Sequence, residues 1–116
     1  MGVPDVIWTV TDPQGRPVTL LDSTWRDHIA TGHPEIRDHE SLSRAVTDPD
    51  AIREEVLDTT VSRKYVRKAT VPEFSSTHLV VAATFERVGP GSVATAYLMR
   101  RQPNQGIEIW KRPAPK

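Results

Sequence analysis

The chain of 116 residues contains no cysteine. It can therefore have no disulfide framework, no thiolate metal site and no thiol nucleophile. The first twenty residues hold no uninterrupted apolar run, and no segment approaches the roughly 18 apolar residues of a membrane span. We therefore expect no signal peptide, no membrane span and a cytoplasmic protein.

The sequence also lacks an excess of charge of either sign. Fifteen lysine and arginine residues balance fifteen aspartate and glutamate residues, which argues against a general nucleic-acid coat protein. The charges are unevenly distributed, because residues 20–58 are mainly acidic whereas residues 61–72 and 97–116 are mainly basic. This asymmetry fits either a face that attracts polyanions or ordinary solvated surface charge.

Alternating or β-branched segments predict the strands. They span residues 6–11, 17–21, 51–57, 63–70, 78–85, 92–99 and 107–110. Asp12-Pro13-Gln14-Gly15 is a turn sequence that joins the first two strands in a hairpin. Segment 51–57 also fits a helical turn, and we favour a strand because Pro49 has just ended a helix.

The first expected helix spans about residues 24–31, with Thr24 as its N-cap. Trp25, His28 and Ile29 follow at the spacing of one helical face. A second helix is expected over about residues 40–47. The order of these elements predicts a single α+β domain over residues 1–116, with the core at about 6–110. We expect an N-terminal β-hairpin and two helices packed on a three- to four-stranded antiparallel sheet.

Residues 25–35 hold the densest group of side chains that titrate near neutral pH. They include His28 and His33, and a Gly-His-Pro sequence stops the helix there. Histidine is the side chain best suited to proton transfer near neutrality. Structural roles are the alternative, since His28 could pack beside Trp25 and His33 could offset the helix macrodipole as a C-terminal cap.

A metal site is not predicted at this corner. The spacing of His28 and His33 does not place both rings on one regular helical face, and the chain has no His-Glu-x-x-His motif. We expect neither a metal nor a cofactor.

Two strands carry side chains that could complete a site at the corner. Arg63, Tyr65 and Arg67 would share one face of their strand, and Thr95 and Tyr97 one face of theirs, together with the side chain at position 93. If both faces point toward the helix end, guanidinium, phenol, hydroxyl and imidazole groups meet, which suits a phosphodiester. Alternatively, the tyrosines are ordinary sheet aromatics and the threonine an ordinary strand residue.

Five short motifs resemble those of a nuclease family. They are Trp25-x-x-His28-Ile29-x-x-x-His33-Pro34-Glu35, Asp48-Pro49-Asp50-x-Ile52, Tyr65-Val66-Arg67, Leu79-Val80-Val81 and Thr95-Ala96-Tyr97. Together they are similar to phage-associated members of the barnase–EndoU–colicin E5/D–RelE (BECR) superfamily of nucleases. The resemblance covers about residues 20–99, and the first motif is the most specific.

The resemblance implies a BECR-like fold and a metal-independent ribonuclease, often a toxin domain. The candidate catalytic residues are His28, His33, Arg67 and Tyr97. The candidate substrate-binding residues are Glu35, Arg63, Tyr65, Lys68 and Thr95.

In the expected reaction, the RNA 2′-hydroxyl attacks its own phosphate while His28 or His33 removes the proton. Arg67 would stabilise the charge on the phosphoryl oxygens. The other histidine or Tyr97 would protonate the leaving 5′-oxygen, which leaves a 2′,3′-cyclic phosphate.

Two other functions stay open at this stage. One is a non-catalytic RNA- or protein-binding module on the same fold, which would use the basic strand 63–68. The other is a toxin held inactive by an antitoxin. The expected partners are RNA and an antitoxin or immunity protein, and the sequence does not set the oligomeric state.

Overall fold

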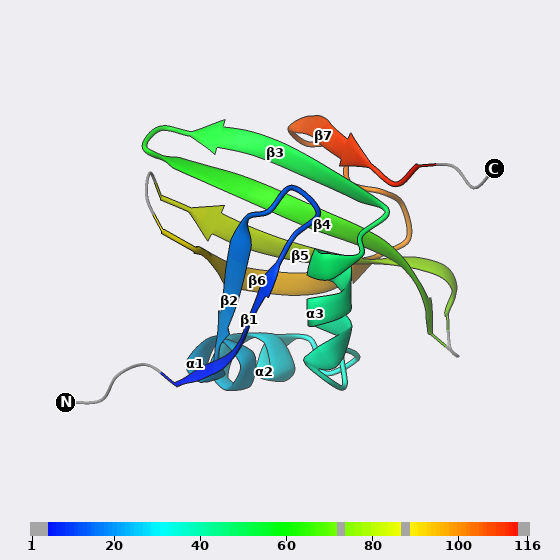
Figure 1. The fold of residues 1–116 in the computed structure, drawn as a ribbon. Helices are drawn as coiled ribbons and strands as arrows, with labels where there is room; N and C mark the ends of the chain where they lie inside the picture. The colour runs from blue at the N-terminus through cyan, green and yellow to red at the C-terminus, as the bar shows by residue number, and fades with distance from the viewer. Residues whose placement is uncertain (1–4, 72–73, 87–88, 114–116) are drawn as a thin grey trace.

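The computed structural model of the chain describes residues 5–71, 74–86 and 89–113. The strands are β1 (Val6–Thr11), β2 (Pro17–Leu21), β3 (Ala51–Leu57), β4 (Thr60–Val71), β5 (Phe74–Phe85), β6 (Gly91–Met99) and β7 (Ile107–Lys111). The helices are α1 (Asp22–Thr24), the π-helix η1 (Trp25–Ile29), α2 (Ala30–Gly32) and α3 (Glu40–Thr47). All these strands join one sheet in the order β1-β2-β6-β5-β4-β3-β7 (Figure 1).

The prediction of an N-terminal hairpin and two helices packed on a three- to four-stranded antiparallel sheet is wrong. Over the described residues the sheet has seven strands, and it is mixed because β2 runs parallel to β6 through the pairs Val18–Gly91 and Thr19–Ser92. Strand β2 buries Val18 and Leu20 completely. Pairing with β6 places these apolar side chains in the interior, and local alternation in the sequence does not specify that partner.

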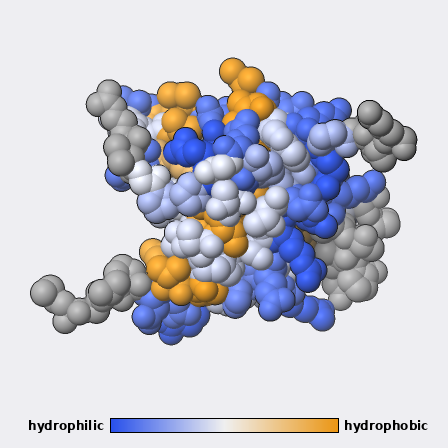
Figure 2. Space-filling model, viewed as in Figure 1, coloured by the Kyte–Doolittle hydropathy of each residue, from blue (hydrophilic) through white to orange (hydrophobic). Residues whose placement is uncertain are grey.

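The core lies between two layers. The β1–β2 hairpin and α3 cross in front of strands β3–β6 (Figure 1). The apolar face of α3, formed by Leu42, Ala45 and Val46, is fully buried. On the viewed surface, apolar side chains form small separate groups among hydrophilic ones (Figure 2). Within the described residues, no helix is long and apolar enough to cross a membrane.

The helical segment after β2 contains a π-turn that the sequence pattern did not predict. The backbone N–H of Ala30 donates to the carbonyl of Trp25, five residues earlier. This wider turn changes the angular spacing of side chains. As a result, Ile29 is buried whereas His28 is exposed, so the predicted common face is wrong.

The limits of this helical segment also differ from the prediction. It begins at Asp22, and Thr24 is not its N-cap. The Asp22 carboxylate instead pairs with Arg26 at 2.6 Å. Gly32 is the last helical residue, in agreement with the expected stop before Pro34.

Strand register decides which candidate residues share a face. Tyr65 lies opposite Val81, which lies opposite Ala96, and Arg67 lies opposite Leu79. Directly opposed residues share a face, so these side chains all point to the core side of the sheet. Arg63 shares that side, as the alternation on its strand predicts.

Thr95 and Tyr97 point to the other side of the sheet. They lie opposite Ala82 and Val80, which alternate with the core-facing residues of β5. The predicted convergence of the β4 and β6 faces is therefore wrong. A register shift between Ala82 and Ala83 also turns Val93 into the core, so Val93 does not share the face of Thr95 as predicted.

The chain crosses this second side of the sheet between β6 and β7. The Arg53 side chain of β3 donates hydrogen bonds to the carbonyls of Asn104, Gln105 and Gly106, at 3.2, 2.9 and 2.8 Å. Pro103 is buried in this connection. The crossover therefore covers part of the sheet side that the hairpin and α3 leave open.

Candidate functional site

The corner after the first helical segment holds a histidine–carboxylate pair. The backbone N–H of His33 donates to the carbonyl of Ile29 at 2.7 Å, and Pro34 prevents further helical bonds. The chain then turns back, and the Nδ1 atom of His33 lies 3.4 Å from Oε1 of Glu35. A hydrogen bond from Nδ1 to this carboxylate would leave Nε2 as the proton acceptor of the ring.

Tyr97 is the strand residue that meets this corner. Its ring centroid lies 6.4 Å from that of His33, with 43° between the planes. Within the described residues, β2 pairs with β6 only at Gly91 and Ser92, and η1 contacts β6. The helix end thus approaches Tyr97 along the edge of β6. Partial burial raises the pKa of the Tyr97 phenol, so the hydroxyl keeps its proton at neutral pH.

An open pocket of about 280 Å³ adjoins the corner. It is lined by Glu35, Thr77, Leu98, Met99 and Arg100. Leu98 and Met99 supply apolar walls, whereas Arg100 supplies an exposed cation at the end of β6. A phosphate beside His33 would find its counter-charge in this guanidinium.

Arg63 and Tyr65 belong to a different, buried cluster. Oδ2 of Asp12 accepts hydrogen bonds from Nη1 of Arg63 at 3.0 Å and from the Tyr65 hydroxyl at 2.7 Å. Nε of Arg63 also donates to Oε2 of Glu54 at 3.0 Å. Because these groups are buried and bonded to one another, the structure places neither candidate in the corner.

Asp12 completes this cluster from the hairpin turn. Its Oδ1 atom accepts from the backbone N–H groups of Gln14 and Arg16, each at 2.9 Å. The guanidinium groups of Arg16 and Arg63 both lie over the Phe85 ring, at 4.6 and 5.4 Å from its centroid. The cluster therefore fastens the hairpin turn to the sheet.

The other candidates lie apart from the His33 corner. Arg67 is bonded to Asp48, with 2.9 Å between Nη1 and Oδ2. His28 is exposed, and no hydrogen bond, ion pair or ring contact joins it to the described residues. Lys68 is exposed, with its backbone N–H bonded to Asp50. Thr95 is half-buried on the sheet side that also carries Tyr97.

The structure adds Thr77 and Arg100 to the candidate site. Thr77 is a buried polar residue in β5, and Arg100 follows β6. The sequence pattern gave only a general signal for Arg100, since it belongs to the basic C-terminal segment. It gave none for Thr77, which precedes the apolar run predicted as a strand. Within the described residues, no three histidine, aspartate or glutamate side chains cluster as metal ligands would.

Comparison with protein-family models, curated proteins and solved structures finds no match to this chain. The resemblance to BECR nucleases stays a prediction from the sequence motifs. The geometry of the corner is the basis for the proposal that follows.

Proposed function

We propose that the protein is a metal-independent endoribonuclease whose catalytic centre is the His33 corner. One observation carries the proposal: the His33–Glu35 pair lies beside Tyr97 and beside a pocket that contains Arg100. These groups supply a proton acceptor, a proton donor and an anion-binding guanidinium, the functions that transesterification of RNA requires.

In the proposed reaction, Nε2 of His33 removes the proton of the ribose 2′-hydroxyl. The 2′-oxygen then bonds to phosphorus and the bond to the 5′-oxygen breaks. The Tyr97 hydroxyl gives its proton to the leaving oxygen, and Arg100 stabilises the charge on the phosphoryl oxygens. The products are a 2′,3′-cyclic phosphate and a free 5′-hydroxyl. Arg100 takes the role expected of Arg67, which is bonded to Asp48.

The test uses a defined single-stranded RNA in the presence of a chelator. The wild-type protein should give fragments with cyclic-phosphate ends. A general base contributes roughly 10²–10⁴-fold, so His33→Gln should lower the cleavage rate at least about a hundredfold. His28→Gln should have a smaller effect, since His28 is exposed and lies apart from the corner. Equal losses in both variants, or full activity of His33→Gln, would contradict the assignment.

A non-catalytic RNA-binding module is the second candidate. It is favoured by the strand register, because Tyr97 points to the side of the sheet opposite to that of Leu98, which lines the pocket. Binding of RNA without any cleavage would support it. Induced expression in bacteria gives a second readout, because a cytoplasmic ribonuclease toxin should arrest growth whereas a binding module should not.

A further inference from the structure

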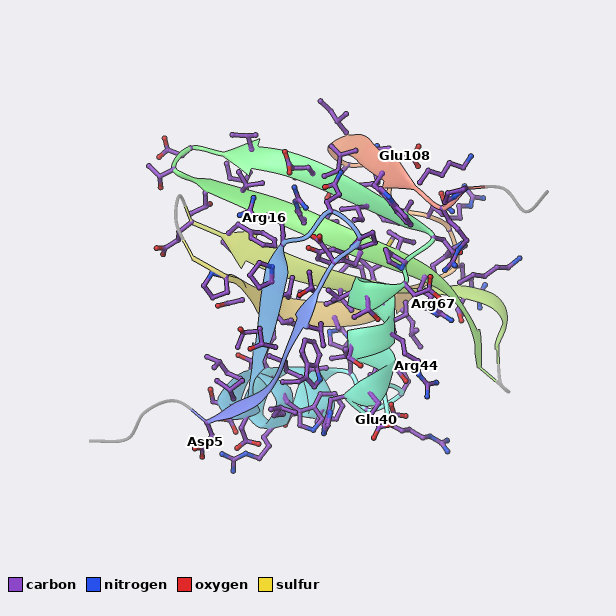
Figure 3. All side chains as sticks on the ribbon, in the orientation of Figure 1. Asp5, Arg16, Glu40, Arg44, Arg67 and Glu108 are labelled. Atoms are coloured by element: carbon purple, nitrogen blue, oxygen red, sulfur yellow. The ribbon has the colours of Figure 1, made fainter. Side chains whose placement is uncertain are left out.

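Two arginines from distant parts of the chain meet at one carboxylate. Arg67 lies on β4, Arg112 follows β7, and Asp48 follows the last turn of α3. Figure 3 shows Arg67 beside one end of α3, with Glu40 at the other end. Oδ2 of Asp48 lies 2.9 Å from Nη1 of Arg67, and Oδ1 lies 2.7 Å from Nη1 of Arg112. Each carboxylate oxygen is therefore bound by a different guanidinium.

This carboxylate is accessible to solvent. The Asp48 side chain is 56% exposed, and the side chains of Arg67 and Arg112 are 33% and 38% exposed. An exposed ion pair contributes little to stability, so the Asp48 side chain can rotate into water at low cost. Arg112 would stay in place, because Nε also donates to Oδ1 of Asp50 at 3.0 Å. Two fixed guanidinium groups around a displaceable anion are suited to binding phosphate.

Arg67 lies on the same side of the sheet as Leu98, which forms one wall of the pocket. Arg67 lies opposite Leu79, and Leu79 lies opposite Leu98, which lines the pocket. Neighbouring strands are about 4.8 Å apart, so the backbone at Arg67 is about 10 Å from that at Leu98. Arg100 follows two residues after Leu98, which adds about 7 Å along the strand direction, so an RNA strand with one phosphate at Arg100 can place another near Arg67 within a few nucleotides.

We propose that Arg67 and Arg112 form a second RNA phosphate subsite, which the Asp48 carboxylate occupies in the free protein. This inference rests on the proposed function, because both subsites bind one RNA strand. Asp48 acts as an internal competitor. RNA must displace this carboxylate from the two arginines. RNA therefore binds the subsite more weakly than it would if Asp48 carried no charge.

The decisive variant is Asp48→Asn. It removes the competing charge and leaves both arginines in the chain. The probe is a fluorescently labelled 2′-O-methyl RNA of about ten nucleotides, which binds but cannot be cleaved. Fluorescence anisotropy should show a dissociation constant about tenfold lower than that of the wild type, the size of one charge-assisted interaction. The slope of log affinity against log salt concentration should also steepen by about 0.7.

Asp38→Asn is the matched control. Asp38 is an exposed aspartate at the opposite end of α3, where it accepts hydrogen bonds from Ser41. The substitution removes the same charge from the molecule and leaves the ion pairs of Arg67 and Arg112 with Asp48 in place. The gain in Asp48→Asn should exceed that in Asp38→Asn, and it should disappear when Arg67→Gln is added. Equal affinities in the two aspartate variants, or a gain that persists without Arg67, would overturn the proposal.

This design separates the subsite from the proposed reaction, because the probe reports binding alone. If unmodified RNA is not cleaved but Asp48→Asn still tightens binding, the ribonuclease proposal fails and the subsite stands. If unmodified RNA is cleaved but Asp48→Asn binds like the control, the subsite fails and the ribonuclease stands. If Asp48 has only a structural role, the Asp48→Asn variant should unfold at a lower denaturant concentration than the wild type and bind the RNA probe no more tightly.

Discussion

At the scale of single residues, the proposed reaction rests on two neighbouring rings. Nδ1 of His33 lies 3.4 Å from Oε1 of Glu35, and partial burial raises the pKa of the Tyr97 phenol. A phenol is protonated at neutral pH and can donate to a leaving oxygen. The proposed division of labour therefore makes His33 the base and Tyr97 the acid.

Tyr97→Phe tests this division of labour. The substitution removes only the hydroxyl, so RNA cleavage should slow by roughly 10²–10⁴-fold while RNA affinity changes little. A uridine 3′-(4-nitrophenyl phosphate) substrate has a leaving group that needs no proton, and its cleavage by the variant should stay close to the wild-type rate. Both reactions are followed as single turnovers. If both slow equally, Tyr97 positions the substrate and does not act as the acid.

At the scale of secondary-structure elements, the buried Asp12 cluster holds the hairpin against the sheet. The carboxylate accepts four hydrogen bonds, two from its own turn and two from β4. Removing the carboxylate would leave the Arg63 guanidinium buried with one fewer partner. Buried charges of this kind are strongly destabilising when a partner is lost.

Asp12→Ala should therefore lower the free energy of unfolding by about 3–5 kcal/mol, measured by urea denaturation. Tyr65→Phe removes one hydrogen bond of the cluster and should cost about 1 kcal/mol. Glu55→Ala is a control at an exposed position of β3 and should change the free energy by less than about 0.5 kcal/mol. A loss in Asp12→Ala no larger than that of the control would show that the cluster does not fasten the hairpin.

Local patterns in the sequence predicted the strands and α3, but not their assembly. Because alternate side chains of a strand point to the same face, Arg63, Tyr65 and Arg67 share one face whichever strands lie beside them. The pattern does not name the neighbouring strand, so it could not show that Tyr97 faces the other way.

Other local features carried no readable signal. Neither the π-turn before Ala30 nor the register shift that turns Val93 inward follows from the local apolar pattern. Asp12 is a typical turn residue, and nothing near it in the sequence reveals the arginine and tyrosine that it binds. His33 and Glu35 were both predicted as site residues, but their contact depends on the turn at Pro34 and was not predicted.

At the scale of the whole molecule, acidic side chains that accept hydrogen bonds link stability to pH. Bonds from Arg67 and Arg112 hold the pKa of Asp48 below its ordinary value, and bonds from Ser41 do the same for Asp38. A carboxyl group whose pKa is lower in the folded than in the unfolded state stabilises the protein at pH values above its unfolded-state pKa of about 3.9. That contribution is lost as the pH falls through the lower, folded-state pKa.

The free energy of unfolding should therefore decrease as the pH falls below about 4. Asp38→Asn and Asp48→Asn each remove one titrating group, so the decrease should be smaller in each variant and smallest in the double variant. Urea denaturation at pH 6 and pH 3 measures the difference. Each effect should be modest, because both carboxylates are exposed. An identical decrease in the wild type, the two single variants and the double variant would contradict a role for these carboxylates.

The parallel pairing of β2 with β6 has a consequence for the order in which the fold forms. It joins Val18 to Gly91, so a long stretch of chain must close on itself before this part of the sheet exists. The hairpins between neighbouring strands close much shorter loops and should form earlier. If the chain cleaves RNA, the corner beside β6 should therefore gain its activity only in the last steps of folding.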